Sequence, residues 1–277
     1  MTCFGRAAFA AVAVATIASC SSAPPQEAAA PAPIAESEAP RDARPAAFTA
    51  LAAPSPDALQ GAAIRVWATN YYTPVYQTGA EGLPLLGPDN QALSGLITRT
   101  QWCNAALQGS VSLEEPGGAV TAYVFADQNG PEQTNCDDRL GTLSQAIKTA
   151  TRKVRFNAVD HPYGCGVRGW PLIPYRTIAV DPGIIAYQTT LYLPALAGKT
   201  FEIDGAAFTH DGFVFAADRG GAIKDTHIDF FSGNSRRVSF PDVVTSNENR
   251  TVDAFIVSPD SPQAAALAAL HSAPCTS

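Results

Sequence analysis

The sequence is short of positive charge and lacks the spacings that usually hold a metal. Its 277 residues include 18 Lys and Arg against 25 Asp and Glu, which gives a formal net charge of −7. A nucleic-acid partner would call for a basic face, and this balance argues against one. Neither a CxxC pair nor a His-x-x-x-His spacing occurs, which argues against zinc. We therefore expect no nucleic-acid partner, no metal and no organic cofactor.

The apolar run near the start of the chain is too short for a stable membrane span. Residues 1–20 carry Arg6, an apolar stretch over 7–17 and small residues at the end, which is typical of a secretory signal. Their last four letters, IASC, resemble a bacterial lipobox, in which the cysteine is acylated. We predict a signal peptide over 1–19 and a lipid on Cys20, which would anchor the chain to a membrane. The alternative is ordinary cleavage near Ala18, with Cys20 left as a free thiol.

Residues 20–60 contain almost nothing that could form a core. Ala, Pro, Glu and Ser dominate this stretch, which predicts a disordered or polyproline-like tether. No Asp follows Cys20, so the sorting rule of enteric bacteria favours the outer membrane. We expect a bacterial envelope protein whose folded part, residues 61–277, lies in the periplasm.

Four of the six cysteines lie in that expected folded part, at positions 103, 136, 165 and 275. An even number in an exported chain indicates disulfides and an oxidising compartment. Three pairings are possible, and the sequence does not choose among them. The pairing that we predict joins Cys103 to Cys136 and Cys165 to Cys275.

Short runs with strand character dominate the folded part, with Gly and Pro between them. They span residues 63–72, 109–113, 119–126, 153–159, 176–181, 189–196, 213–218, 227–231 and 253–258. Helical patterning is limited to about 97–107, 143–151 and 263–270. This distribution predicts a β-barrel or sandwich with small helical additions.

Two of these runs carry carboxylates, which strands tolerate poorly. Asp229 lies between the bulky apolar residues Ile228 and Phe230, where a structural role is hard to find. Asp218 precedes two glycines, and Asp181 precedes a proline, so each of these two could also form a turn.

The segments WPLIPYRTIAVDPGII (170–185), YLPALAG (192–198) and DRGGAIKDTHID (218–229) together resemble the three-aspartate, or 3D, domain. This domain is also the C-terminal part of the membrane-bound lytic transglycosylase A family. The segment NYYTPVYQ (70–77) resembles the family's Gly-Tyr-Tyr-x-Pro stretch. The three namesake acids fall on Asp181, Asp218 and Asp229.

The resemblance implies a fold dominated by β-structure: a six-stranded double-psi β-barrel with extra strands, a few short helices and an insertion around 104–168. It also implies a groove for a peptidoglycan glycan strand. Enzymes of this kind cleave the β-1,4 bond between N-acetylmuramic acid and N-acetylglucosamine without water and leave a 1,6-anhydromuramic end. On this reading Asp229 is the catalytic acid and base, and Asp218 and Asp181 tune it, orient it or bind sugar hydroxyls.

The chemistry requires one carboxyl group that first gives a proton to the glycosidic oxygen and then takes one from the C6 hydroxyl. Its pKa must be raised, and apolar neighbours together with a second carboxylate can raise it. The substrate-binding candidates are Lys224, His227, Gly220, Gly221 and Tyr72. Each has an ordinary alternative, as a solvated cation, a satisfied histidine, turn glycines or a core aromatic.

This chain departs from the family pattern at two glycines, where it has Gln188 and Asp225. Both changes put the shape of the groove in question, because a turn with positive φ favours glycine. The alternative function is a non-catalytic peptidoglycan-binding lipoprotein that uses the same groove. A hydrolytic glycosidase is a third reading, and it would need another carboxylate to activate water.

Overall fold

A computed structural model describes residues 48–203 and 205–275. The predicted signal peptide, the lipid site at Cys20 and most of the predicted tether lie outside the described residues. The C-terminal part of the predicted tether is structured: Phe48 is 7% exposed and packs against Phe201 and Phe208, and β1 begins at Leu59. One aromatic ring in an Ala/Pro-rich stretch is enough to fix it to the core. Within the described residues, no helix has the length and apolar character that crossing a membrane requires.

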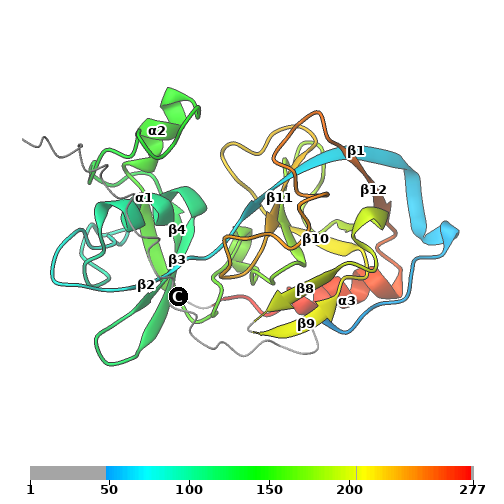
Figure 1. The fold of residues 1–277 in the computed structure, drawn as a ribbon, viewed down its shortest axis with the longest axis horizontal. Helices are drawn as coiled ribbons and strands as arrows, with labels where there is room; N and C mark the ends of the chain where they lie inside the picture. The colour runs from blue at the N-terminus through cyan, green and yellow to red at the C-terminus, as the bar shows by residue number, and fades with distance from the viewer. Residues whose placement is uncertain (1–47, 204, 276–277) are drawn as a thin grey trace, which may run out of the picture. The chain divides into compact units, whose positions relative to one another are not determined.

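Six strands close into a barrel (Figure 1). Their order around it is β1 (Leu59–Tyr71), β11 (His227–Phe231), β6 (Thr177–Ala179), β10 (Phe213–Asp218), β7 (Thr190–Tyr192) and β12 (Val252–Val257). β1 runs parallel to β11 and β6 runs parallel to β10, whereas the other neighbours are antiparallel. The predicted six-stranded double-psi β-barrel is confirmed.

Alternation along the strands sorts side chains between the barrel interior and its outer face. The interior cluster takes alternate residues from every strand, among them Val66, Ala68, Ile178, Leu191, Val214, Ala216, Ile228, Phe230 and Ala254. The residues between them on β1 and β11 face outward. Asp229 and its neighbours therefore lie on the outer face of the barrel.

A second, four-stranded sheet lies between β1 and β6 in the chain. Its order is β2 (Val75–Gln77), β3 (Ser110–Glu114), β4 (Val120–Asp127) and β5 (Arg155–Val159). It has its own core, centred on the fully buried Trp102, Val111, Leu113 and Phe156. The inserted segment therefore starts earlier than residue 104, because β2 pairs with β3. The sequence did not predict β2 as a strand, because three residues are too few to show a two-residue alternation.

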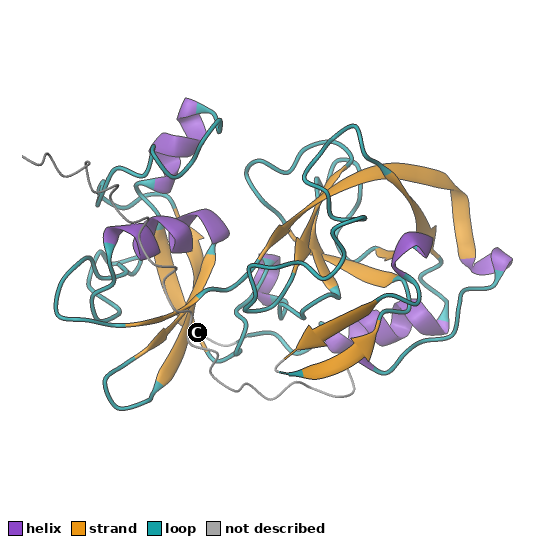
Figure 2. Cartoon of the chain, viewed as in Figure 1, coloured by secondary structure: helices purple, strands orange, loops and turns teal. Residues whose placement is uncertain are grey.

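The helices are few and short, as Figure 2 shows. They are α1 (Arg99–Gln108), α2 (Gln145–Thr151) and α3 (Pro262–Leu270), with 3-10 turns η2 (Pro56–Ala58), η3 (Val167–Gly169) and η4 (Pro194–Leu196). Thr98 and Gln101 form a capping box at the start of α1, and Gly109 ends that helix with φ 77°. The sequence missed one hairpin, β8 (Thr200–Ile203) with β9 (Ala206–Thr209).

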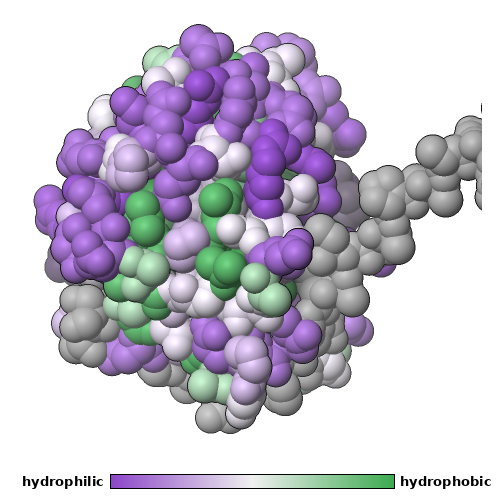
Figure 3. Space-filling model, turned by 90° about the vertical axis from the view of Figure 1, so that its left-hand side faces the viewer, coloured by the Kyte–Doolittle hydropathy of each residue, from purple (hydrophilic) through white to green (hydrophobic). Residues whose placement is uncertain are grey.

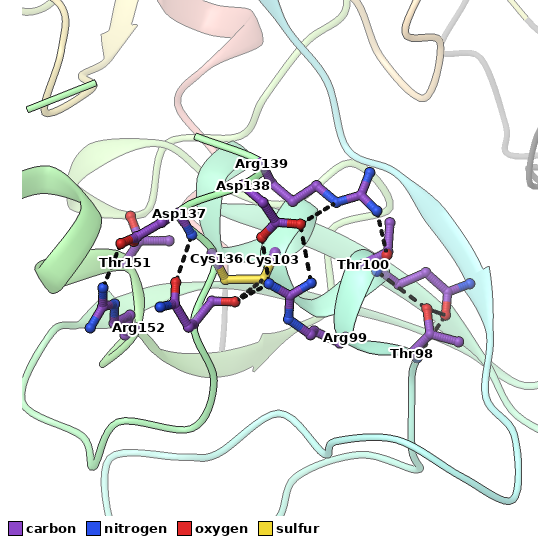
Figure 4. Close-up of a disulfide and its surroundings, with 12 residues drawn as sticks. Thr98, Arg99, Thr100, Cys103, Cys136, Asp137, Asp138, Arg139, Thr151 and Arg152 are labelled. Atoms are coloured by element: carbon purple, nitrogen blue, oxygen red, sulfur yellow. Dashed lines mark hydrogen bonds and ion pairs between the residues drawn. A yellow bond between two sulfur atoms is a disulfide. The ribbon is translucent and has the colours of Figure 1, made fainter. Parts of the chain in front are cut away.

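Both predicted disulfides are present. Cys103 in α1 is bonded to Cys136 (Figure 4), and Cys165 is bonded to Cys275 near the end of the chain. Ion pairs on the surface flank the first disulfide: Arg99–Asp138, Arg139–Asp138 and Arg152–Asp137. Such exposed pairs add little to stability, so the covalent bond is the main link here.

The surface in Figure 3 is mostly hydrophilic, with a small group of hydrophobic residues near its centre. The exposed large hydrophobic residues between β2 and β5 are Leu93, Leu107, Val120 and Phe125. Scattered apolar side chains of this kind are ordinary on a protein surface.

Candidate active site

The parallel pairing of β1 with β11 builds one side of the site. The register places Trp67 opposite His227, Thr69 opposite Asp229 and Tyr71 opposite Phe231. Residues two apart share a face of a strand, so all six side chains are on the outer face of the barrel. The six side chains, from strands about 160 positions apart in the sequence, thus form a single row on the outer face.

Asp229 takes part in a short hydrogen-bonded chain in this row. The Thr69 hydroxyl donates to Asp229 Oδ1 at 2.6 Å, and the same hydroxyl oxygen lies 2.8 Å from His227 Nε2. The His227 ring stacks on Trp67, with ring centroids 3.6 Å apart and planes at 10°. The stack and the hydrogen bond together hold the imidazole beside Thr69.

Asp218 of β10 lies on the far side of β6, and a shift of register after Ala216 turns it to the same outer face. The register places Ala179 of β6 next to Asp229 on one side and next to Asp218 on the other. Two strand spacings amount to about 10 Å between the backbones that carry the two carboxylates. Tyr71 from β1 donates its phenolic O–H to Asp218 Oδ2 at 2.9 Å. The barrel therefore brings the two aspartates together without a direct hydrogen bond between them.

The environment makes both carboxyl groups weaker acids than usual. Burial raises the pKa of Asp229 to about 7, the charge of Asp218 adds to this, and the Thr69 hydrogen bond opposes it. Burial raises the pKa of Asp218 to about 6, against hydrogen bonds from Tyr71 and from the backbone N–H groups of Arg219 and Val167. At neutral pH Asp218 is mostly ionised, whereas Asp229 is divided between its two protonation states.

The hydrogen-bonded chain can serve Asp229 in both of these states. Burial lowers the pKa of His227, so its ring is neutral at pH 7, and the ring also bonds to the carbonyl of Ala222. When Asp229 is ionised, Thr69 donates to it, and the single N–H of the neutral His227 ring then has either the Thr69 oxygen or the Ala222 carbonyl as its acceptor. When Asp229 is protonated, it can donate to Thr69, whose own proton then turns toward His227 Nε2. A carboxyl group with such partners is suited to give up a proton and take one back.

Asp181 lies in a different environment from Asp218 and Asp229. Its Oδ1 accepts the backbone N–H of Gly183 and its Oδ2 accepts that of Asp225, both at 3.0 Å. These bonds, together with the charge of Lys224, hold the pKa of Asp181 below its usual range. Asp181 therefore ties the turn after β6 to the loop before β11, and no hydrogen bond joins it to Asp218 or Asp229 among the described residues.

The two positions that depart from glycine have a left-handed backbone. Gln188 has φ 68° and Asp225 has φ 56°, the conformation that glycine would favour. The N–H of Gln188 bonds to the carbonyl of Ala216 at 2.8 Å, and that of Asp225 bonds to Asp181. These backbone hydrogen bonds hold both residues in a conformation that is strained for a residue with a Cβ atom.

The other binding candidates fall into two groups. Lys224 and Gly221 are exposed, and Gly220 lies against Ile223, in the loop between β10 and β11. Tyr72 is only 5% exposed, and its hydroxyl accepts a hydrogen bond from Asn104 of α1 at 3.0 Å. Tyr72 follows Tyr71 in the chain, so its side chain points to the opposite face and lies in the core next to the four-stranded sheet. This position does not suit contact with a sugar.

Sequence reasoning did not identify Thr69, and it did not connect Tyr71 with Asp218. The available signal was the two-residue period of the first strand, which places Trp67, Thr69 and Tyr71 on one face. The alternation alone does not show that these residues form a site, because it does not tell which strand pairs with β1. Among the described residues, no group of three or more His, Cys, Asp or Glu is placed to hold a metal ion.

All three namesake aspartates fall in one stretch of the chain, from β6 to the loop after β11. Residues 176–239 match the 3D domain. The 3D-domain segment supplies Asp218, His227 and Asp229, whereas Thr69 and Tyr71 come from outside it. The resemblance predicted from the sequence is confirmed over these 64 residues.

Several solved structures are similar to the chain. Escherichia coli MltA with bound chitohexaose is 20% identical, with 70% of this chain and 72% of that chain covered and a TM-score of 0.47. A membrane-bound lytic murein transglycosylase from Agrobacterium tumefaciens is 16% identical, with coverage of 71% and 77% and a TM-score of 0.46. The lytic transglycosylase LtgG of Burkholderia pseudomallei is 21% identical, with coverage of 70% and 72% and a TM-score of 0.35. No match was found among curated protein sequences.

Proposed function

We propose that this protein is a peptidoglycan lytic transglycosylase. It would cleave the β-1,4 bond between N-acetylmuramic acid and N-acetylglucosamine and leave a 1,6-anhydromuramic end. The observation that carries the proposal is a half-buried carboxyl group, Asp229, which accepts a hydrogen bond from Thr69 and whose pKa is raised to about 7 inside a 3D-domain segment. A group that titrates near the working pH is suited to act first as an acid and then as a base.

The reaction needs a single proton cycle on Asp229. Protonated Asp229 gives its proton to the glycosidic oxygen as the bond from that oxygen to muramic C1 breaks. The resulting carboxylate then takes the proton of the muramic C6 hydroxyl as O6 bonds to C1. The proton gained balances the proton given, and no water is consumed.

The neighbours of Asp229 have distinct parts in this scheme. Asp218 keeps a negative charge beside Asp229 and so favours its protonated form at the start. The same charge can stabilise the positive charge that develops at C1 in the transition state. Tyr71 holds Asp218 in place through its O–H. Thr69 and His227 keep Asp229 oriented in both protonation states.

Hydrolysis is less well supported by this arrangement. A hydrolase needs a second carboxylate that is free to activate water. Asp218 instead accepts a hydrogen bond from Tyr71 and others from the Arg219 and Val167 backbones. The alternative, a binding lipoprotein without catalysis, gives no reason for the raised pKa of Asp229.

For its location, we propose that Cys20 carries a lipid and that the barrel lies in the periplasm, at the outer membrane. The support is the lipobox-like sequence before Cys20 and the two disulfides, which suit an oxidising compartment. Labelling with a radioactive fatty acid, compared with a Cys20→Ser variant, tests the lipid. Label that persists in the variant would exclude this site.

The activity is tested with purified sacculi. The mature chain with Cys20→Ser is incubated with them beside Asp229→Asn, and the released products are analysed by mass spectrometry. Anhydromuramic products that appear with the parent and are at least about 1,000-fold fewer with Asp229→Asn are expected. Asp260→Asn, at an exposed aspartate, is the matched control. Products with reducing ends would show a hydrolase, and binding without release would show a binding protein.

A further inference from the structure

The loop that contacts Asp218 also presents a cation on two aromatic rings. Val167 donates its backbone N–H to Asp218, and Arg168 is the next residue. The Arg168 guanidinium carbon lies 5.7 Å from the Trp170 ring centroid and 6.0 Å from that of Tyr187. The two rings meet edge to face at 6.1 Å. These three residues form what we call the arginine platform.

The arginine platform is fixed from several sides. Cys165 is bonded to Cys275, and the N–H of Cys275 in turn bonds to the Gly169 carbonyl at 2.8 Å. The N–H of Gly166 bonds to the Trp170 carbonyl, also at 2.8 Å. Arg168 itself has a left-handed backbone, with φ 56°. A side chain held by stacking on such a loop loses little further freedom when it binds a ligand.

The other half of the platform is tied to the same strand as Asp218. Tyr187 precedes the left-handed Gln188, whose N–H bonds to the carbonyl of Ala216 in β10. Asp218 ends that strand two residues later. Both loops of the platform are therefore hydrogen-bonded to β10, one through Asp218 and the other through Ala216.

The charge of Arg168 is available to a ligand. Its residue is exposed, and among the described parts of the chain it belongs to none of the ion pairs. The chain as a whole has a net charge of −7, so an anionic ligand would be repelled without a local cation. A guanidinium with one face on aromatic rings keeps its N–H groups for a planar, bidentate acceptor, and a carboxylate is such an acceptor.

We propose that the arginine platform binds a carboxylate carried by the muramoyl residue of the glycan strand. This inference rests on the proposed function and specifies its substrate. N-acetylglucosamine is neutral, whereas N-acetylmuramic acid carries a lactyl group at O3, whose carboxylate is either free or extended by an acidic peptide. A cation in the loop that bonds to Asp218 would therefore distinguish the two sugars and set which glycosidic bond reaches Asp229.

The test compares neutral and anionic glycans on the mature chain. Binding is measured by titration calorimetry with Asp229→Asn as the parent, so that no strand is cleaved. The probes are chitohexaose, glycan strands without peptides, which carry free lactyl carboxylates, and strands that keep their peptides. Arg168→Gln is added to the parent, and Arg250→Gln, at another exposed arginine, is the matched control for charge.

We expect Arg168→Gln to weaken binding of an anionic strand about tenfold and to leave chitohexaose unchanged. We also expect the affinity of the parent to fall with added salt more steeply than that of Arg168→Gln. A loss confined to peptide-free strands identifies the lactyl carboxylate as the ligand, and a loss confined to peptide-bearing strands identifies the peptide. A partial recovery with Arg168→Lys would agree with a charge contact.

Two results would overturn the inference. Equal losses for chitohexaose and the anionic strands would show that Arg168 only shapes the groove. Unchanged binding of every strand by Arg168→Gln would show that it has no part in recognition. A parent that binds no glycan at all would instead refute the proposed function, and the inference with it.

Discussion

At the scale of single residues, the site depends on how few partners Asp229 has. Thr69 is the one hydroxyl that bonds to it among the described side chains, and the titratable groups around it are Asp218, Tyr71 and His227. Burial dominates the pKa of Asp229, so the carboxyl group is protonated where an ordinary aspartate would be ionised. Small changes in its hydrogen bonds should therefore move the pH range of activity.

Replacement of Thr69 tests this directly. Thr69→Val removes a hydrogen bond that favours the ionised form, so the pKa of Asp229 should rise above about 7. Since the reaction begins with the protonated form, the fall of kcat/KM with rising pH should shift to higher pH, by roughly 0.5 to 1 unit for one such bond. Thr69→Ser keeps the hydroxyl and should keep the wild-type profile. A Val variant whose rate is lower but whose pH profile is unchanged would contradict this role for Thr69.

At the scale of elements, the loops that join the strands carry the strain of the site. Three of the non-glycine residues with positive φ, Arg168, Gln188 and Asp225, lie in loops that hydrogen-bond to β10 or to Asp181. Each conformation costs on the order of 1 kcal/mol for a residue with a Cβ atom. The family pattern has glycine at two of these positions, and here the backbone N–H groups of Gln188 and Asp225 are hydrogen-bonded.

Gln188→Gly should therefore stabilise the protein. Glycine adopts φ 68° without strain, and the gain should exceed its cost in the unfolded chain, for a net increase of roughly 0.5 to 1 kcal/mol in the free energy of unfolding. Ala186→Gly, two residues earlier in the same loop and with an ordinary φ, should lower it by a similar amount. Urea denaturation of both variants measures the difference. Equal destabilisation by the two glycines would mean that Gln188 gains more from its own contacts than its strain costs.

At the scale of the whole molecule, the two disulfides restrain different regions. Cys103–Cys136 lies in the region of the four-stranded sheet, and its two cysteines are 33 positions apart in the sequence. Cys165–Cys275 spans 110 positions and fastens the end of the described chain to the loop that bonds to Asp218. Their entropic contributions are similar, at about 4 and about 5 kcal/mol, but only the second one touches the site.

Paired serine variants separate these two effects. Cys165→Ser with Cys275→Ser should lower the free energy of unfolding and also reduce kcat/KM in the folded protein, because Val167 is then less firmly held against Asp218. Cys103→Ser with Cys136→Ser should lower stability alone. Activity is measured at a temperature where circular dichroism shows both variants folded. Equal activity of the two double variants would show that the loop keeps its position without the covalent bond.

The sequence by itself determined most of the strands and the cysteines available for pairing, because two-residue alternation and residue type are local signals. Its resemblance to the 3D domain predicted the barrel and singled out Asp218 and Asp229 as candidate site residues. Only the tertiary structure decided that Thr69 bonds to Asp229, that Tyr71 rather than Tyr72 faces the site, and that Asp181 holds two loops together. It also placed β2 in the second sheet. The physical reason is that alternation fixes which face a side chain takes, whereas strand pairing and barrel closure decide which distant residue stands opposite it.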